Sequence, residues 1–298
     1  MKQVKTTVIG SYPVDIKNQE MMNNYFKNIE TDWNQYIKKS VQDMINAGID
    51  IISDGQTRDP FVNIYLRKIK GIRIKTRPEI VDKIQYQQPI TLDDLKYVKK
   101  IIPENKEIIG LLAGPYTLTK SCVDSYYKDE KQIAFDFAEV IAQEAERIQK
   151  HVNMISLDEP FYSVEMPEYA CELIKKIVKR VKIPIRLHAC GDVTKIIPNL
   201  IELPVDVLSH EFKATENLIQ EFGKYSFKQK ICLGTVRSDD TRLETIDEIV
   251  THIKKAEKIL SDKIAQISPD CGLRLLPQKI AYQKLVNMVK GCEKVYGR

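Results

Sequence analysis

The sequence lacks a hydrophobic run long enough to cross a bilayer. Its longest apolar stretch, residues 108–113, is far shorter than the roughly 20 residues that a membrane helix needs. The first residues carry no apolar core of a secretory signal. Cysteine is sparse, with six irregularly spaced residues among 298, which excludes a disulfide-built scaffold and indicates reduced thiols. We therefore expect a cytoplasmic protein with no membrane-spanning segment.

A strong charge imbalance is also missing, because 46 basic and 41 acidic residues leave a net charge of only +5. No nucleic-acid-binding motif accompanies this mild excess, so we expect no nucleic-acid partner. The densest basic stretch is Arg67–Arg77, in which Ile72 and Ile74 alternate with Arg73 and Lys75. This alternation predicts the exposed face of a strand or hairpin. The alternative is a docking surface for an anionic ligand or an acidic partner.

Short β-branched runs alternate with amphipathic helical segments along almost the whole chain. The predicted strands are Lys5–Gly10, Ile49–Ser53, Glu107–Ala113, Val152–Leu157, Ile183–His188, Val205–Ser209, Lys230–Gly234 and Lys263–Ser268. The predicted helices are Asp32–Ala47, Lys131–His151, Glu168–Val181, Val193–Leu203, Thr215–Tyr225, Thr245–Ser261 and Gln278–Tyr296.

Eight strands separated by helices, with no Gly/Ser-rich linker, predict an α/β fold: a single (β/α)8 TIM barrel over residues 1–298. An open doubly wound sheet is the alternative, but it would usually show a glycine-rich first turn, and Gly10-Ser11 is not that fingerprint. Residues 60–105 are too many for one strand-to-helix loop. We expect an insertion there, after strand 2, with its own hairpin and short helix.

Four metal-binding side chains directly follow predicted strands. His188 and Cys190 are two residues apart, so they point the same way on an extended segment, and Glu211 and Cys271 follow two other strands. The carboxyl ends of barrel strands meet at one rim, which is where active sites of such barrels lie. One imidazole, two thiolates and a carboxylate form a ligand set suited to Zn²⁺. The alternative is that the cysteines are buried as small hydrophobic residues.

The charge of this ligand set indicates the chemistry. Two thiolates and a carboxylate would leave a zinc site near −1, a poor Lewis acid for hydrolysis. Such a site is better suited to holding a substrate thiol as a thiolate. The residues therefore predict alkylation of a thiol.

Further motifs at strand ends resemble, together with this ligand set, the catalytic barrel of the cobalamin-independent methionine synthase family. The motifs are Ile9-Gly10-Ser11, Gly114-Pro115-x-Thr117, Asp158-Glu159-Pro160, His188-x-Cys190, Glu211 and Pro269-Asp270-Cys271-Gly272-Leu273. The resemblance covers essentially the whole chain. The chain has no room for the second, N-terminal barrel of the long enzymes, so it is similar to the short, archaeal-type core form.

The resemblance implies that Zn²⁺ at the four ligands binds the sulfur of homocysteine and that the product is methionine. It also implies substrate-binding residues in the Ile9-Gly10-Ser11 loop, which meets the carboxylate of the amino acid, and at Asp158, which meets its amine. Gln56 stands where the long enzymes have a glutamate. Turn-forming residues of these types also occur in loops without any substrate, which is the alternative for each of them.

The residues that bind the methyl donor in this family are less well matched in this sequence than the residues that bind homocysteine. Asp239 takes the place of the family's catalytic histidine, and the only tryptophan, Trp33, lies in the first predicted helix rather than at a strand end. A folate donor needs a positioned acid and an aromatic platform, whereas a methylated corrinoid needs neither. We therefore expect a methylated corrinoid, free or bound to a protein, rather than methyltetrahydrofolate. Two other functions stay open: a related zinc alkyltransferase acting on coenzyme M, and a non-catalytic barrel with a structural zinc.

Overall fold

The computed structural model of the 298-residue chain describes residues 4–13, 32–58 and 62–297. Its central sheet has eight parallel strands in the order β1-β11-β10-β9-β8-β7-β5-β2. Their bounds are β1 Lys5–Thr6, β2 Ile51–Ile52, β5 Glu107–Ala113, β7 Met154–Asp158, β8 Ile185–His188, β9 Val207–His210, β10 Lys230–Val236 and β11 Ile264–Pro269. A parallel bridge between Thr7 and Ile51 links the first and last strands of this order. The predicted (β/α)8 barrel is thereby confirmed.

The strands are buried on both faces, as expected for a parallel sheet covered by helices. In β5, Ile109 and Leu111 pack with Ile51 in one small cluster, whereas Ile108 and Leu112 join the large core that includes the helices. Successive residues of a strand point to opposite faces. The small cluster therefore fills the inside of the barrel, and the large one lies between the barrel and the helices.

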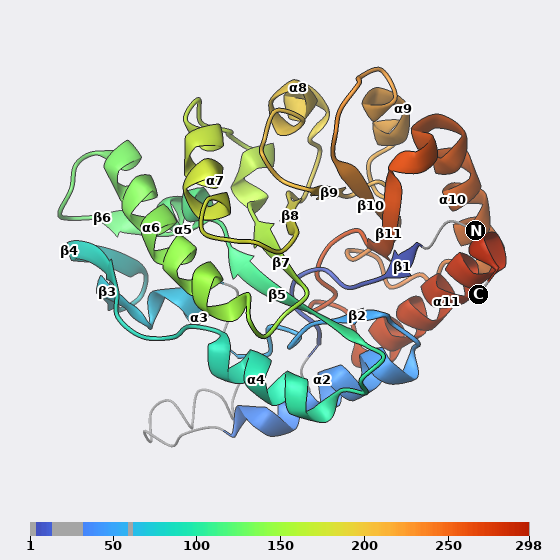
Figure 1. The fold of residues 1–298 in the computed structure, drawn as a ribbon, viewed down its shortest axis with the longest axis horizontal. Helices are drawn as coiled ribbons and strands as arrows, with labels where there is room; N and C mark the ends of the chain where they lie inside the picture. The colour runs from blue at the N-terminus through green and yellow to red at the C-terminus, as the bar shows by residue number, and fades with distance from the viewer. Residues whose placement is uncertain (1–3, 14–31, 59–61, 298) are drawn as a thin grey trace.

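Helices surround the sheet (Figure 1). Their bounds are α2 Trp33–Asn46, α3 Asn63–Leu66, α4 Leu92–Ile101, α5 Pro115–Lys120, α6 Glu130–Ile148, α7 Ala170–Val178, α8 Ile197–Leu200, α9 Leu218–Phe222, α10 Ile246–Leu260 and α11 Gln278–Tyr296, with 3₁₀ turns at Pro160–Ser163, Thr194–Ile196 and Ser261–Lys263. None of the helices in the described part of the chain is long and apolar enough to cross a membrane.

Two predicted helices are reduced to one turn or little more. In the predicted helix Val193–Leu203, the first turn is a 3₁₀ helix, and α8 covers only residues 197–200. Pro198 has no N–H to donate to an earlier turn, which interrupts the continuous helix. In the predicted helix Thr215–Tyr225, Asn217 adopts a left-handed conformation with φ of 67°, so α9 begins after it.

A second, three-stranded sheet lies to one side of the barrel (Figure 1). The strands β3 Ile69–Ile74 and β4 Pro78–Tyr86 form the predicted antiparallel hairpin, and Arg73 and Lys75 lie on its exposed face. The third strand, β6 Val123–Asp124, pairs with β4 from outside residues 60–105 and was not predicted. In contrast to the hairpin, α4 packs against α2, α6 and β5, so it belongs to the helical layer around the barrel.

Candidate metal centre

Three of the four predicted metal ligands converge at the carboxyl ends of β8 and β11. The Nε2 atom of His188 lies 3.0 Å from Sγ of Cys190, and this sulfur lies 2.8 Å from Sγ of Cys271. All three atoms are within 4.8 Å of one another. The two strands are separated in the sheet by β9 and β10, so the ligands meet across the rim of the barrel.

The orientation of His188 leaves one ring nitrogen for a metal. Its Nδ1 faces the carbonyl oxygen of Ser209 at 3.1 Å, which accepts a hydrogen bond from a protonated Nδ1. Its Nε2 faces the sulfur of Cys190 and is the nitrogen that a metal could bind. Histidine ligands of metal sites are held by the same kind of contact to a carbonyl or carboxylate.

The contact between the two sulfur atoms shifts the pKa values of the two thiols in opposite directions. The contact with Cys190 lowers the pKa of Cys271 well below its usual value, although burial acts in the opposite direction. The same contact, together with burial, raises the pKa of Cys190 well above its usual value. One nitrogen and two sulfur donors directed to one point fit the tetrahedral coordination by nitrogen and sulfur that zinc prefers, and binding would require both sulfur atoms to be deprotonated.

Glu211, the fourth predicted ligand, follows β9 and is half-buried. Burial raises the pKa of its carboxyl, and the nearby charge of Cys271 raises it further. Its carboxylate is outside the tight group formed by the other three ligands. Coordination by Glu211 stays a prediction.

The loop after β1 packs directly against the loop that carries Cys271. A Cβ atom added to Gly272 would lie 2.9 Å from the amide nitrogen of Ser11, so only glycine permits this approach. Gly10 has φ of +49°, a conformation that favours glycine. Gly10 and Ser11 thus lie beside the candidate metal centre. The Ile9 side chain instead packs inside the barrel against Val207 and Cys232. Ile9 can therefore offer a ligand only its backbone.

Two buried acceptor oxygens near strand ends have no hydrogen-bond partner among the residues that the structure describes. The Oδ1 atom of Asp158 accepts from Ser156 at 2.7 Å, but Oδ2 is unpaired. The Oε1 atom of Gln56 is also unpaired and lies near Gly10. Asp158 is in register with His188 on the neighbouring strand. Because unpaired buried acceptors cost free energy, these oxygens indicate a place for a ligand that donates hydrogen bonds.

Glu159 does not share this role with its neighbour Asp158. Its carboxylate accepts hydrogen bonds from the backbone of Tyr116 and from the backbone and hydroxyl of Thr117, at 2.7–3.0 Å. Burial raises its pKa to about 7, while these donors oppose the shift. Glu159 thus holds the start of α5, where free backbone N–H groups need acceptors.

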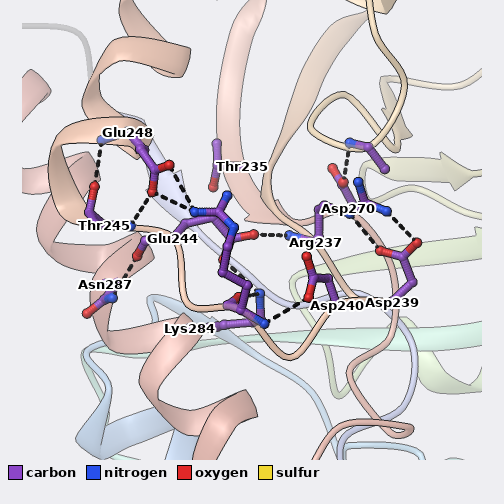
Figure 2. A network of polar contacts seen from close by, with 12 residues as sticks. Thr235, Arg237, Asp239, Asp240, Glu244, Thr245, Glu248, Asp270, Lys284 and Asn287 are labelled. Atoms are coloured by element: carbon purple, nitrogen blue, oxygen red, sulfur yellow. Dashed lines mark hydrogen bonds and ion pairs between the residues drawn. The ribbon is translucent and has the colours of Figure 1, made fainter.

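Asp239 lies on the loop after β10, where Figure 2 shows it directed towards Arg237. The guanidinium binds both carboxylate oxygens, at 2.9 and 2.8 Å, and lowers the pKa of Asp239. Its side chain is 61% exposed. An exposed carboxylate held ionised by arginine is a poor proton donor. The same loop is anchored by the buried ion pair between Lys284 and Glu244, at 2.7 Å.

His252 of α10 contacts the end of β10 rather than lying free on the surface of the helix. Its Nε2 donates to the carbonyl oxygen of Gly234 at 3.0 Å, and the side chain is half-buried against the end of β10. Burial, aided by the charge of Lys213, lowers its pKa to about 4. The helical period alone could not show this contact because the strand end lies beside the polar edge of the helix.

The pKa of His252 predicts a loss of stability in acid. The unfolded chain has the ordinary value of 6.5 and binds the proton more readily, so this contribution to stability is present above pH 6.5 and lost as pH falls towards 4. Between pH 7.5 and pH 5, the free energy of unfolding should therefore fall in both proteins, but by about 1–2 kcal/mol less in His252→Gln than in the wild type. Urea unfolding at both pH values measures this difference, and equal losses would contradict it.

Known proteins resemble this chain over nearly its full length. The family model described as the catalytic domain of cobalamin-independent synthase matches residues 4–294. The methionine synthase of Methanocaldococcus jannaschii is 36% identical over 96% of this chain and 97% of its own length. That of Saccharolobus solfataricus is 30% identical over 97% of this chain and 94% of its own.

Solved structures show the same fold. A B12-independent methionine synthase from a Shewanella species, in complex with selenomethionine, superposes with a TM-score of 0.83 at 22% identity, over 99% of this chain and 98% of that one. The putative enzyme of the same type from Listeria monocytogenes gives a TM-score of 0.79 at 19% identity, with both chains covered completely.

Proposed function

Because the chain belongs to the cobalamin-independent methionine synthase family, we propose that it transfers a methyl group to the sulfur of homocysteine and forms methionine. One observation carries this proposal: His188, Cys190 and Cys271 converge beside the unpaired buried oxygen of Asp158. A thiol-binding centre next to an acceptor for an ammonium group matches a substrate that carries both groups.

We propose Zn²⁺ at His188, Cys190 and Cys271, with Glu211 as the fourth ligand. The observed donor set supports this choice, and the half-buried carboxylate of Glu211 is close enough to Cys271 to feel its charge. Bound zinc would keep the substrate sulfur in its thiolate form at neutral pH. The carboxylate is the ligand most readily replaced when a thiol arrives.

The protein's own residues would orient the amino acid. The Oδ2 atom of Asp158 and the Oε1 atom of Gln56 are buried acceptors that an ammonium group satisfies. The backbone and hydroxyl of Ser11 lie beside Gly272 and offer donors to a carboxylate. Coenzyme M has a sulfonate and no ammonium group, so these acceptors favour homocysteine.

For the donor we propose a methylated corrinoid rather than methyltetrahydrofolate. The leaving amine of a folate must be protonated, but Asp239 is exposed and held ionised by Arg237. The aromatic side chain of Trp33 belongs to α2, in the outer layer of helices. Cobalamin-independent enzymes hold no resident cobalamin; in this proposal the corrinoid is a substrate and not a resident cofactor. An acidic corrinoid protein could meet the exposed side chains of Lys70 and Lys75 on the β3–β4 hairpin, where Arg73 is already paired with Glu79.

An assay of methyl transfer tests both parts of this proposal, the homocysteine acceptor and the corrinoid donor. Zinc-loaded protein is incubated with homocysteine and either methylcobalamin or methyltetrahydrofolate, in mono- and polyglutamyl forms, and methionine is quantified. We expect methionine with methylcobalamin and none above background with folate. Efficient turnover with folate would reject the corrinoid donor alone. Failure to bind homocysteine in calorimetry would reject the whole proposal.

A further inference from the structure

Arg186 is a fully buried arginine inside the barrel, two residues before His188 on β8. Its Nε donates to Oγ of Ser156 at 3.2 Å, and one terminal nitrogen donates to the carbonyl oxygen of Val8 at 3.0 Å. The other terminal nitrogen approaches Oε1 of Gln266 and Sγ of Cys232, at 3.5 and 3.7 Å. The guanidinium therefore reaches from β8 to β7, β10, β11 and the segment that follows β1.

No carboxylate forms an ion pair with Arg186 among the residues that the structure describes. A buried charge without an opposite charge in contact is costly, and an apolar side chain of similar size would fill the same space. The packing of the barrel interior thus does not explain an arginine at this position. Its hydrogen bonds must supply what an apolar residue could not.

The first of these hydrogen bonds determines the state of Asp158. Arginine can only donate, so the Ser156 hydroxyl accepts from Arg186 and has its single proton left for another partner. That proton goes to Oδ1 of Asp158, at 2.7 Å. Asp158 is therefore held as an acceptor in one orientation, with Oδ2 left open.

The second hydrogen bond acts on the other side of the candidate site. Val8, whose carbonyl accepts from Arg186, immediately precedes the Ile9-Gly10-Ser11 loop. This loop packs against Gly272, next to Cys271. One rigid, planar group thus connects the strand end of Asp158 with the loop of Ser11.

We propose that Arg186 is a positioning residue for the amino-acid part of the substrate. Through Ser156 it orients Asp158 towards the ammonium group, and through Val8 it fixes the distance from Asp158 to the loop that meets the carboxylate. The inference rests on the proposed function, because it assumes a substrate with both groups. Arg186 touches neither the metal ligands nor the substrate in this arrangement.

Binding of two thiols to zinc-loaded protein tests the proposal. Homocysteine has the amino group, and 4-mercaptobutyrate is the same molecule without it. In the wild type we expect homocysteine to bind about 10- to 100-fold more tightly, as for a charge-assisted hydrogen bond. In Ser156→Ala and in Arg186→Met this preference should fall to about threefold or less, as in Asp158→Asn, while zinc content stays at one per chain.

A matched control separates positioning from general stability. Glu144 is another fully buried charged residue, and it holds Thr91 and Tyr86 on the outside of the barrel. Glu144→Gln should lower stability but keep the wild-type preference for the amine. An unchanged preference in Ser156→Ala would overturn the role of Arg186, even if Arg186→Met does not fold. No preference in the wild type would overturn the proposed substrate, and with it this inference.

Discussion

Replacing Cys271 with serine is expected to remove the metal and abolish methyl transfer. A hydroxyl is a much poorer zinc ligand than a thiolate, and Cys271 contributes one of the three closely grouped donor atoms found among the described residues. We expect zinc affinity to fall by more than about 100-fold, since removing a residue that only hydrogen-bonds to a metal ligand already lowers affinity by up to about that factor. Zinc content after gel filtration, measured by atomic absorption, reports the effect.

Cys171 provides the control for this change. It is half-buried like Cys271 but lies in α7, with its sulfur 3.9 Å from the carbonyl oxygen of Glu202. Cys171→Ser should keep one zinc per chain and full activity. One zinc per chain in the Cys271→Ser protein would show that the metal is held at another site.

Replacing Lys284 with methionine is expected to cost about 3–5 kcal/mol of unfolding free energy. The side chains of Lys284 and Glu244 are both essentially inaccessible, at 0% and 1% exposure. The ammonium donates to Glu244 at 2.7 Å and to the carbonyl oxygen of Arg242 at 2.6 Å. Its loss leaves a buried carboxylate without its counter-charge. Chemical denaturation monitored by circular dichroism measures the change.

Two further variants test whether the loss of stability comes from the buried charge. Glu244→Gln added to Lys284→Met removes the uncompensated charge while keeping an acceptor for the backbone N–H of Arg237, so much of the stability should return. Lys294 also joins α11 to α10, but its pair with Asp247 is largely exposed, and Lys294→Met should change little. Equal costs for Lys284→Met and Lys294→Met would refute the role assigned to burial.

The barrel was predictable because most of its strands are long enough to carry a pattern and are separated by helical segments. The two short strands, β1 and β2, lie within longer β-branched runs of the sequence. The helix Gln278–Tyr296 even has the predicted bounds, since Pro277 sets its beginning and Gly297 adopts a left-handed conformation at its end. The two-residue strand β6 carries no period, and its pairing with β4 joins segments distant in sequence. Such a strand becomes recognisable only in three dimensions.

The convergence of His188, Cys190 and Cys271 was predictable because each follows a strand directly, and parallel strands of a barrel end at one rim. The sequence did not predict the hydrogen bonds that connect Arg186 through Ser156 to Asp158. Within a strand, alternating polar residues usually indicate a face in water. In a barrel the second face points to the enclosed interior, so Arg186 and Ser156 are buried rather than solvated. Sequence periodicity does not distinguish these two environments.

The order of strands around the barrel also has a consequence for how the protein is made. The last strand, β11, lies between β1 and β10, so the two ends of the chain must meet before the ring is complete. Cys271 follows that strand, while His188 and Cys190 follow β8. Contacts between distant segments form slowly because loop closure comes first. We therefore expect metal capture to be a late event in folding, because a chain interrupted before β11 carries His188 and Cys190 but lacks Cys271.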